Sequence, residues 1–201
     1  GALGFGDTHH SEDNGVKMSK NEWQICSISH KFHACCHGLH AMLEAFGDAR
    51  FAPCDVAALH IRTHPRWMSV CNIAEPTTGL AAKFSYAQTA AMTLLGHDTG
   101  AIASYTDAIC SDVDVLALRE KIKISEDERL TETQVEISVK MENGGLRRFR
   151  HDLMEGMTLE TRSEKLKAKG AALLGDTRAD TLWQVVQGDT LRDLSDQLLI
   201  S

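Results

Sequence analysis

The sequence predicts an α+β fold, and three patterns carry that prediction. Apolar residues alternate with polar ones from Gln134 to Lys140, as expected of a strand with one buried face. Asn143-Gly144 follows and favours a hairpin, because both positions of a tight two-residue turn need positive φ. Leucines recur at helical spacing from residue 159 to residue 174, which indicates a helix near the C-terminal end.

The chain divides into three expected parts. Residues 1–20 are rich in glycine and polar residues and show no period, so we expect a flexible lead-in there. Residues 21–155 hold all of the expected strands and form the α+β domain, and residues 156–201 form a helical C-terminal segment. The chain starts at Gly1 rather than Met, so we expect further residues upstream.

Periodicity, caps and breakers predict the remaining elements. A helix is expected from His37 to Phe46, where Gly47 ends it. A longer helix is expected from Pro76 to Leu95, capped by one of the two threonines after the proline. The other expected strands cover residues 23–28, 56–61 and 121–125, and the other expected helices cover residues 67–71, 112–119, 178–188 and 190–199.

Composition excludes two classes of partner. The net charge of -7 argues against a nucleic-acid-binding protein, which needs a cationic face to displace counterions from phosphates. A run of about 18 apolar residues is absent, so the sequence predicts no membrane span. The six cysteines lie in or beside apolar segments, where free cysteine behaves as a small hydrophobic residue. We therefore expect reduced thiols and a cytoplasmic protein.

The densest chemical segment runs from His30 to His40 and holds one lysine, four histidines and two cysteines. It lies between an expected strand and an expected helix, a common place for binding groups. His37 and His40 are three apart and share one helix face, with Lys31 in the preceding loop. The lysine charge and the helix N-terminus favour a carboxylate, and an imidazole titrates near neutral pH. These residues suit acid–base chemistry on a polycarboxylate.

Two other interpretations of this segment stay open. A zinc site fits poorly, because Cys35, Cys36 and His37 are consecutive and no second ligand pair at short spacing follows. We therefore predict no metal ligands, and a metal-binding module remains the least favoured alternative. Some histidines are expected to be ordinary surface residues, and the polar surroundings favour this for the following: His9, His10, His30 and His151.

The segment from Pro76 to Gln88 is the second candidate for functional residues. Most of it reads as a buried helix with small residues, in which Ser85 bonds back to the preceding turn. A Gly-x-Ser-x-Gly elbow is absent, so a hydrolase nucleophile is not expected. The sequence also has no dinucleotide-binding or phosphate-binding glycine loop.

Taken in order, these two segments resemble the MmgE/PrpD family. Members carry a lysine, a short stretch ending in Cys or His, and a histidine at the start of a helix, which here are Lys31, Cys36 and His40. They then carry a proline, Ala-x-Phe-Ser and a helix of small residues, which match Pro76 and the stretch from Ala82 to Ser85. The hairpin and a lysine-containing helix at residues 164–169 follow, so the resemblance covers residues 20–185 and the family's C-terminal part.

The resemblance implies a fold and an activity. Members have a large helical domain and a smaller α+β lid domain, with the active site in the cleft between them. They dehydrate 2-methylcitrate, decarboxylate cis-aconitate or epimerise iminodisuccinate without a metal or organic cofactor, and they are usually homodimers. By resemblance Lys31 contacts a substrate carboxylate, and His40 transfers protons with His37 in reserve. The N-terminal helical domain is missing here, so the chain alone is expected to be inactive.

Departures from the family pattern lie at the site itself. Cys36 stands where several members have a histidine, and Gln88 stands where a tyrosine is expected. With Ser85 these two residues are expected to bind substrate. The family proline is replaced around His33 and Ala34. A glutamine cannot transfer a proton as a tyrosine can, so a non-catalytic binding or dimerisation module that keeps the lid fold is the second hypothesis.

Overall fold

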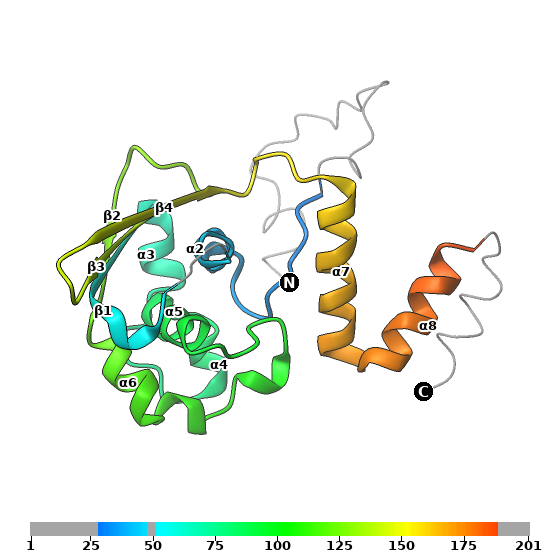
Figure 1. Cartoon of the computed structure of the whole chain (residues 1–201), viewed down its shortest axis with the longest axis horizontal. Coiled ribbons are helices and arrows are strands. Elements are labelled where there is room, and N and C mark those ends of the chain that lie inside the picture. Colours follow the sequence, from blue (N-terminus) through cyan, green and yellow to red (C-terminus); the bar gives the residue numbers. More distant parts are fainter. Residues whose placement is uncertain (1–27, 48–50, 189–201) are drawn as a thin grey trace, which may run out of the picture. The chain divides into compact units, whose positions relative to one another are not determined.

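The structure is a computed structural model that describes residues 28–47 and 51–188. The expected lead-in, most of the expected strand at 23–28 and the expected helix at 190–199 lie outside these residues. The remaining elements belong to one compact unit that starts at Lys31. They combine a mixed four-stranded sheet with packed helices, which confirms the predicted α+β class (Figure 1).

Along the chain, β1 lies between two groups of helices, and β2, β3 and β4 follow one another before the last two helices. The strands are β1 (Val56–Thr63), β2 (Ile122–Glu126), β3 (Gln134–Met141) and β4 (Leu146–Asp152). The α-helices are α2 (His40–Phe46), α3 (Pro65–Val70), α4 (Gly79–Ala82), α5 (Tyr86–Leu94), α6 (Val113–Arg119), α7 (Leu159–Leu174) and α8 (Asp176–Val186). The 3-10 turns are η2 (His37–Leu39), η3 (Pro53–Asp55), η4 (Ile102–Ser104) and η5 (Ala108–Cys110).

The sheet has the strand order β2-β1-β3-β4. β1 pairs in parallel with β2 and antiparallel with β3, and β3 pairs antiparallel with β4. Ile61 of β1 lies opposite Ile124 on one side and Ile137 on the other, so the three strands turn the same apolar rows to one face. Alternation along β1 and β3 therefore produces one buried face and one polar face.

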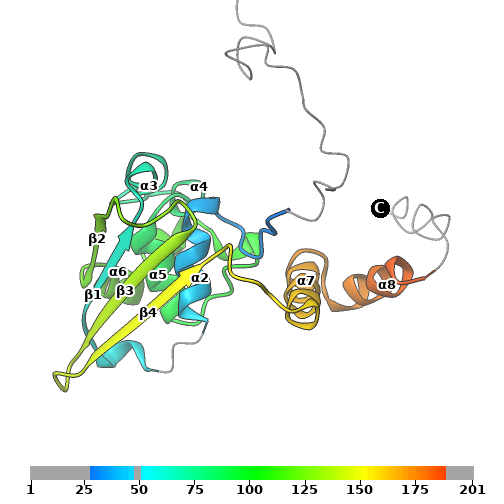
Figure 2. The same ribbon diagram turned by 90° about the horizontal axis from the view of Figure 1, so that it is seen from above.

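The buried face of the sheet packs against α2, α5 and α6, which lie on the same side of it (Figure 2). Met42 of α2, Met92 of α5 and Val115 of α6 are completely buried, as are Ile61 and Ile137 on the strands. Each such side chain contributes about 1.5–3 kcal/mol to folding. This single layer of helices forms the scaffold that holds the histidine-rich segment, because that segment leads directly into α2.

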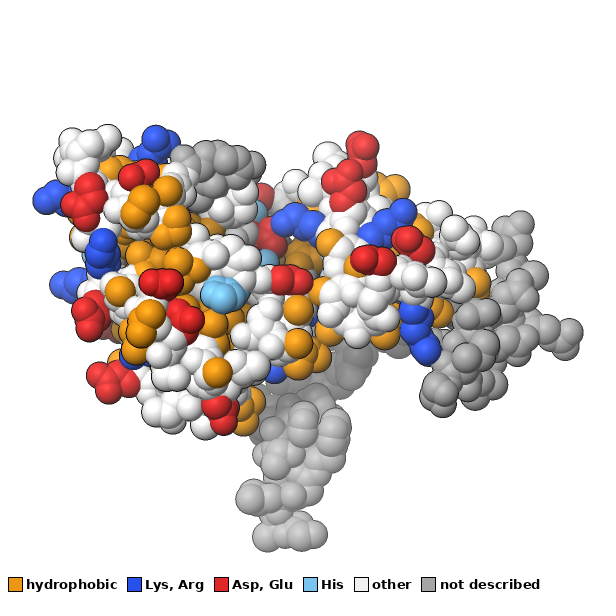
Figure 3. Space-filling model, turned by 60° about the horizontal axis from the view of Figure 1, so that its bottom comes forward, with side chains coloured by type: hydrophobic (Ala, Val, Ile, Leu, Met, Phe, Trp, Pro, Cys, Tyr) orange, Lys and Arg blue, Asp and Glu red, His pale blue; other side chains and the backbone are white. Residues whose placement is uncertain are grey.

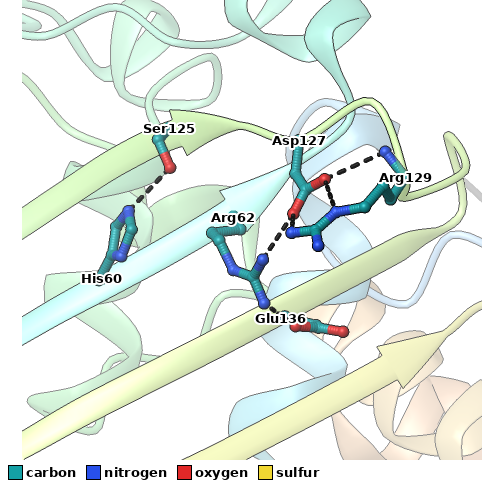
Figure 4. A network of polar contacts seen from close by, with 6 residues as sticks. All are labelled: His60, Arg62, Ser125, Asp127, Arg129 and Glu136. Carbon is teal, nitrogen blue, oxygen red and sulfur yellow. Dashed lines mark hydrogen bonds and ion pairs between the residues drawn. The ribbon is translucent and has the colours of Figure 1, made fainter.

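The opposite face of the sheet carries charged and polar side chains (Figure 4). Arg62 on β1 donates from Nη1 to Oδ2 of Asp127 at 2.5 Å and also bonds to Glu136 on β3. His60 and Ser125 form a further hydrogen bond of 2.8 Å between β1 and β2. These contacts tie neighbouring strands together on the polar face.

Most of the predicted elements are confirmed, but the long helix expected from Pro76 to Leu95 is wrong. The structure has two helices there, α4 and α5, with Lys83–Ser85 between them. Thr78 caps α4 by accepting from Ala81, and Ser85 caps α5 by accepting from Gln88. The chain turns at Lys83 and Phe84, and the Ile73 N–H donates to the Phe84 carbonyl at 3.0 Å beside the isolated bridge between Asn72 and Ser85. Ser85 is therefore a cap residue and does not lie in a helix interior.

The predicted hairpin is present, but its turn differs from the two-residue turn that Asn143-Gly144 suggested. Lys140 pairs with Leu146, so five residues lie between the last paired positions. Gly144 has a φ of 82°, whereas Asn143 does not have positive φ. The Asn143 Oδ1 instead accepts from the Gly145 N–H at 2.9 Å, which stabilises the loop as a side-chain-supported turn.

The helices α7 and α8 form a pair joined at Gly175 and contain no buried residue. The Lys167 ammonium lies 5.1 Å from the centre of the Trp183 ring, which links the two helices. Leu159 on α7 and Val186 on α8 are exposed, as is Leu80 on α4. Figure 3 shows apolar side chains gathered on the face turned forward, so the described residues leave apolar surface uncovered. Within residues 28–47 and 51–188, no helix has both the length and the apolar character needed to cross a bilayer.

Candidate active site

The segment from Lys31 to His40 is fixed by contacts with three later segments of the chain. The Ala34 N–H donates to the Thr99 carbonyl at 2.8 Å, and the Cys36 N–H donates to the Lys83 carbonyl at 2.9 Å. The buried Tyr86 hydroxyl donates to the Gly38 carbonyl at 2.6 Å. Gly38 is required here, because a Cβ at this position would lie 2.5 Å from the Trp67 ring. The loop before α2 is therefore part of the packed structure.

Three imidazole rings of this segment contact one another. The ring centres of His37 and His40 are 5.1 Å apart, as their shared helix face predicted. His33 approaches His40 from another side, with ring centres 5.2 Å apart and planes at 79°. His33 was not among the predicted site residues, since nothing in its spacing distinguishes it from its neighbours. The structure thus places His40 between two other histidines.

His40 is 1% exposed, and its buried Nε2 has no hydrogen-bond partner among the described residues. Burial, together with the charges of His33, His37 and Lys31, lowers the pKa of His40 to about 3. The ring is therefore neutral near pH 7. A buried nitrogen without a partner costs about 1–3 kcal/mol, so this atom is poised to bond to a group that the described residues do not supply.

Lys31 lies on the exposed side of the segment, and its charge acts on the same groups. Burial and then Lys31 lower the pKa of His37, and Lys31 also contributes to the lowered pKa of His40. The structure thus brings together Lys31, His37 and His40, the three residues that the sequence placed in a catalytic role.

Two further lysines add positive charge to this region. The Lys169 Nζ on α7 donates to the Gly100 carbonyl at 2.7 Å. The Lys83 ammonium lies 5.4 Å from the centre of the Tyr105 ring. Burial lowers the pKa of Lys169, and the charges of Lys31 and Lys83 lower it further. Excess positive charge around a neutral imidazole suits an anionic ligand.

The cysteines near the site are free thiols. Cys35 is buried, and burial raises its pKa to about 12. Burial also raises the pKa of Cys71, which contacts Cys36 through its thiol. Cys35 and Cys71 are therefore protonated near neutral pH and do not act as thiolate nucleophiles. Cys36 is half-buried at the position where the sequence suggested a substrate contact.

The other two predicted substrate-binding residues are engaged within the fold. Ser85 and Gln88 are both 0% exposed. Besides capping α5, Ser85 pairs with Asn72 in an isolated bridge. The Gln88 side chain donates to the Ile109 carbonyl at 3.0 Å and accepts from Arg119 at 2.9 Å. The structure thus does not bring Ser85 and Gln88 to the histidines as free side chains, and both serve to hold α5 in place.

Three residues that the sequence did not single out complete the surroundings of His40. Glu44, one turn later on α2, bonds to His33 at 3.1 Å and to Lys165 on α7. Thr99 bonds to the other nitrogen of His33 at 2.7 Å. The helical spacing between His40 and Glu44 could have identified Glu44 from the sequence. Thr99 and Lys165 are too distant in sequence to be identified by a spacing pattern. Among the described residues, no group of three or more His, Cys, Asp or Glu side chains is arranged to hold a metal ion.

A separate hollow of about 630 Å³ opens beside the turn between β3 and β4. Phe51, Asp55, Glu142 and Arg147 are among the residues that line it. None of its lining residues belongs to the segment from Lys31 to His40, so the hollow is distinct from the candidate active site.

Comparison with known proteins agrees with the fold. The model of the MmgE/PrpD C-terminal domain matches residues 33–187, which include His37, His40 and the lysines of α7. A search of curated proteins found no match. The family match spans more than three quarters of the chain and lies mostly within the predicted range of 20–185, but it begins after Lys31. The chain therefore belongs to the MmgE/PrpD family and contains its C-terminal domain.

Proposed function

We propose that the chain supplies one part of an active site for acid–base chemistry on a small di- or tricarboxylate. The family contains dehydratases and related lyases. The observation that carries the proposal is the buried His40, whose Nε2 lacks a partner while the charge of Lys31 reaches the same ring. In this site Lys31 anchors a carboxylate, and His40 transfers a proton at the adjacent carbon, with His37 as the reserve group.

A carboxylate ligand compensates for the excess positive charge of the site and for the lowered pKa of His40. It offsets the positive charge of Lys31 and the neighbouring lysines, and it raises the pKa of His40 from about 3 toward the range that suits a general base. The bound substrate thus activates the base that acts on it. Fixed positive charges also stabilise the enolate-like transition state that forms when a proton leaves a carbon beside a carboxylate.

Three reactions use these parts: dehydration, decarboxylation and epimerisation. Each needs a proton moved at a carbon next to a carboxylate, so 2-methylcitrate, citrate and cis-aconitate are the first substrates to test. Cys36 lies beside the site with a thiol that contacts substrate in this proposal, in the place where relatives carry a histidine. This difference favours a substrate or reaction distinct from that of histidine-containing relatives.

The proposed site is completed by a helical domain upstream of this chain. The exposed apolar side chains of α7 and α8, together with the absence of buried residues on both helices, support their packing against such a domain. A homodimer of the complete protein is part of this proposal.

Turnover of the three carboxylates by the full-length protein tests the proposal. Lys31→Ala removes the carboxylate anchor, so we expect kcat/KM to fall by about a hundredfold or more, with the larger change in KM. Lys140→Ala removes an exposed lysine on the polar face of the sheet and serves as the matched control with unchanged turnover. Unchanged turnover in Lys31→Ala removes Lys31 from the mechanism. Carboxylate binding by calorimetry without any turnover instead supports the second candidate, a binding module that lost catalysis.

A further inference from the structure

His33 has both ring nitrogens engaged by buried partners. Its Nδ1 lies 2.7 Å from the Thr99 Oγ1, and its Nε2 lies 3.1 Å from the Glu44 Oε1. Thr99 is 5% exposed and the Glu44 side chain 6% exposed. Two short bonds from opposite sides of the ring, to groups on different segments, leave His33 one orientation.

The charge of Glu44 also fixes where the proton of His33 lies. Burial alone would raise the pKa of Glu44, but the hydrogen bonds from His33 and Lys165 outweigh burial and lower the pKa to about 2. Glu44 is thus a carboxylate near neutral pH and can only accept hydrogen bonds. The Nε2 of His33 therefore carries a proton and donates it to Glu44. In the neutral ring, Nδ1 accepts from the Thr99 hydroxyl.

His33 in turn packs edge-on against His40, with ring centres 5.2 Å apart and planes at 79°. Both nitrogens of His33 are already hydrogen-bonded, so His33 cannot form a hydrogen bond with the Nε2 of His40. That atom has no partner among the described residues. His37 packs on His40 with ring planes at 39°. The groups that act on His40 are Lys31, His33 and His37 on its own segment and Glu44 on α2.

We propose that Glu44 and His33 form a positioning dyad for His40, in which Glu44 fixes the tautomer and plane of His33 and His33 fixes the plane of the His40 ring. The dyad keeps Nε2 of His40 in the orientation required for proton transfer, a role that rests on the proposed function. The hydrogen bonds and ring contacts of the dyad do not depend on a bound substrate. Neither Glu44 nor His33 touches the reacting atoms, since their polar groups are used by each other, by Thr99 and by Lys165.

Nitrogen NMR of the 201-residue chain with isotope-labelled histidine tests the dyad without any assay of turnover. In His33→Phe the aromatic ring remains but both hydrogen bonds are lost. We expect the His40 signals to broaden, because the neighbouring ring is no longer held. We expect the pKa of His40 to rise, because a protonated His33 no longer opposes the protonation of His40.

In Glu44→Gln we expect His33 to lose its single tautomer and His40 to broaden as well. Glu155→Gln, at an exposed glutamate in the loop after β4, is the matched control and leaves both rings unchanged. Thr99→Val removes only the hydroxyl that holds Nδ1 and gives the same readout if Glu44→Gln does not fold. Unaltered titration and line width of His40 in the folded variants overturn the dyad and reduce Glu44 to a structural link between α2 and α7.

Full-length protein adds a second readout once a substrate is known. A positioning role predicts that His33→Phe lowers kcat by about tenfold to a hundredfold with little change in KM. A protein that shows the NMR changes but turns over no carboxylate contradicts the proposed function and leaves the dyad intact. A protein that turns over carboxylates equally well with and without His33 contradicts the dyad alone.

Discussion

At His40, burial and neighbouring positive charge act in the same direction. The side chain is enclosed by the helices, and His33, His37 and Lys31 all disfavour a charged imidazole. Natural proteins rarely keep a buried nitrogen unsatisfied without a functional reason. This arrangement lowers the stability of the chain, and the loss grows as the pH falls.

Stability of the chain is predicted to fall as the pH is lowered from 6.5 toward 3. The unfolded histidine takes up a proton near pH 6.5, whereas His40 in the folded chain does so only near pH 3. The unfolded state thus binds more protons in this range, and the free energy of unfolding falls with pH by up to about 2 kcal/mol at about pH 5. Above pH 6.5 the contribution of His40 is fully retained.

Urea unfolding at a series of pH values measures this dependence. Glu44 adds a similar loss at lower pH, because its own pKa is lowered from 4.5 to about 2, so the range above pH 4.5 isolates the histidines. His40→Gln is expected to flatten the slope there while leaving the part due to Glu44. An unchanged slope in His40→Gln assigns the effect to other histidines.

At the scale of elements, the break between α4 and α5 shows where sequence periodicity fails. Apolar and small residues continue at helical spacing through Lys83–Ser85, so the pattern alone predicts one helix. Two distant partners interrupt it: the Cys36 N–H bonds to the Lys83 carbonyl, and the Ile73 N–H bonds to the Phe84 carbonyl. Both carbonyls would otherwise face the next helical turn. Such bonds depend on the tertiary fold and leave no local signal.

Elements whose signals are local were predicted well. The strand β3 follows from alternation and β1 from the apolar residues at 56–61. The helix α7 follows from leucine spacing, and the structure adds Thr158 as its cap. The turn between β3 and β4 was located correctly, but its conformation depends on the Asn143 side chain, which supports the loop by a hydrogen bond. The Asn-Gly dipeptide alone does not determine which turn conformation forms.

The position of α7 is predicted to depend on two lysine contacts. Lys165 bonds to Glu44 and Lys169 donates to the Gly100 carbonyl, and α7 has no buried residue to add to these contacts. Lys165→Met is expected to cost about 1 kcal/mol and to speed amide hydrogen exchange in α7. Lys167→Met is the matched control, because Lys167 contacts Trp183 on α8 and leaves the bond to Glu44 in place. Equal exchange in both variants would show that another contact holds α7.

At the scale of the whole molecule, the sequence reaches only the local part of the candidate site. Lys31, His37 and His40 were predicted because they lie within one segment and match a family pattern, and their catalytic roles stay a prediction. Thr99 lies 66 positions from His33, and Lys165 lies 121 positions from Glu44. Pairings over such separations are set by how the helices pack on the sheet, so no spacing rule reveals them.

The proposed helical domain is expected to change the behaviour of α7 and α8. In the 201-residue chain both helices lack buried residues, so their amides should exchange rapidly. In the full-length protein we expect exchange in these helices to slow by about tenfold or more, because packing against a second domain adds at least 1.4 kcal/mol of local stability. Amides of β3 are the internal reference, since the core protects them in both proteins. Equal exchange of α7 and α8 in the two proteins contradicts the proposed packing.

The anchoring of the loop before α2 has a consequence for ligand affinity. The Ala34 and Cys36 amides and the Gly38 carbonyl are already bonded to the body of the fold. A ligand that arrives at this loop therefore does not have to order it, and little conformational entropy is lost on that account. Differences in affinity between carboxylates should then arise from the fit of their charges to rigid partners, and should appear in their dissociation rates.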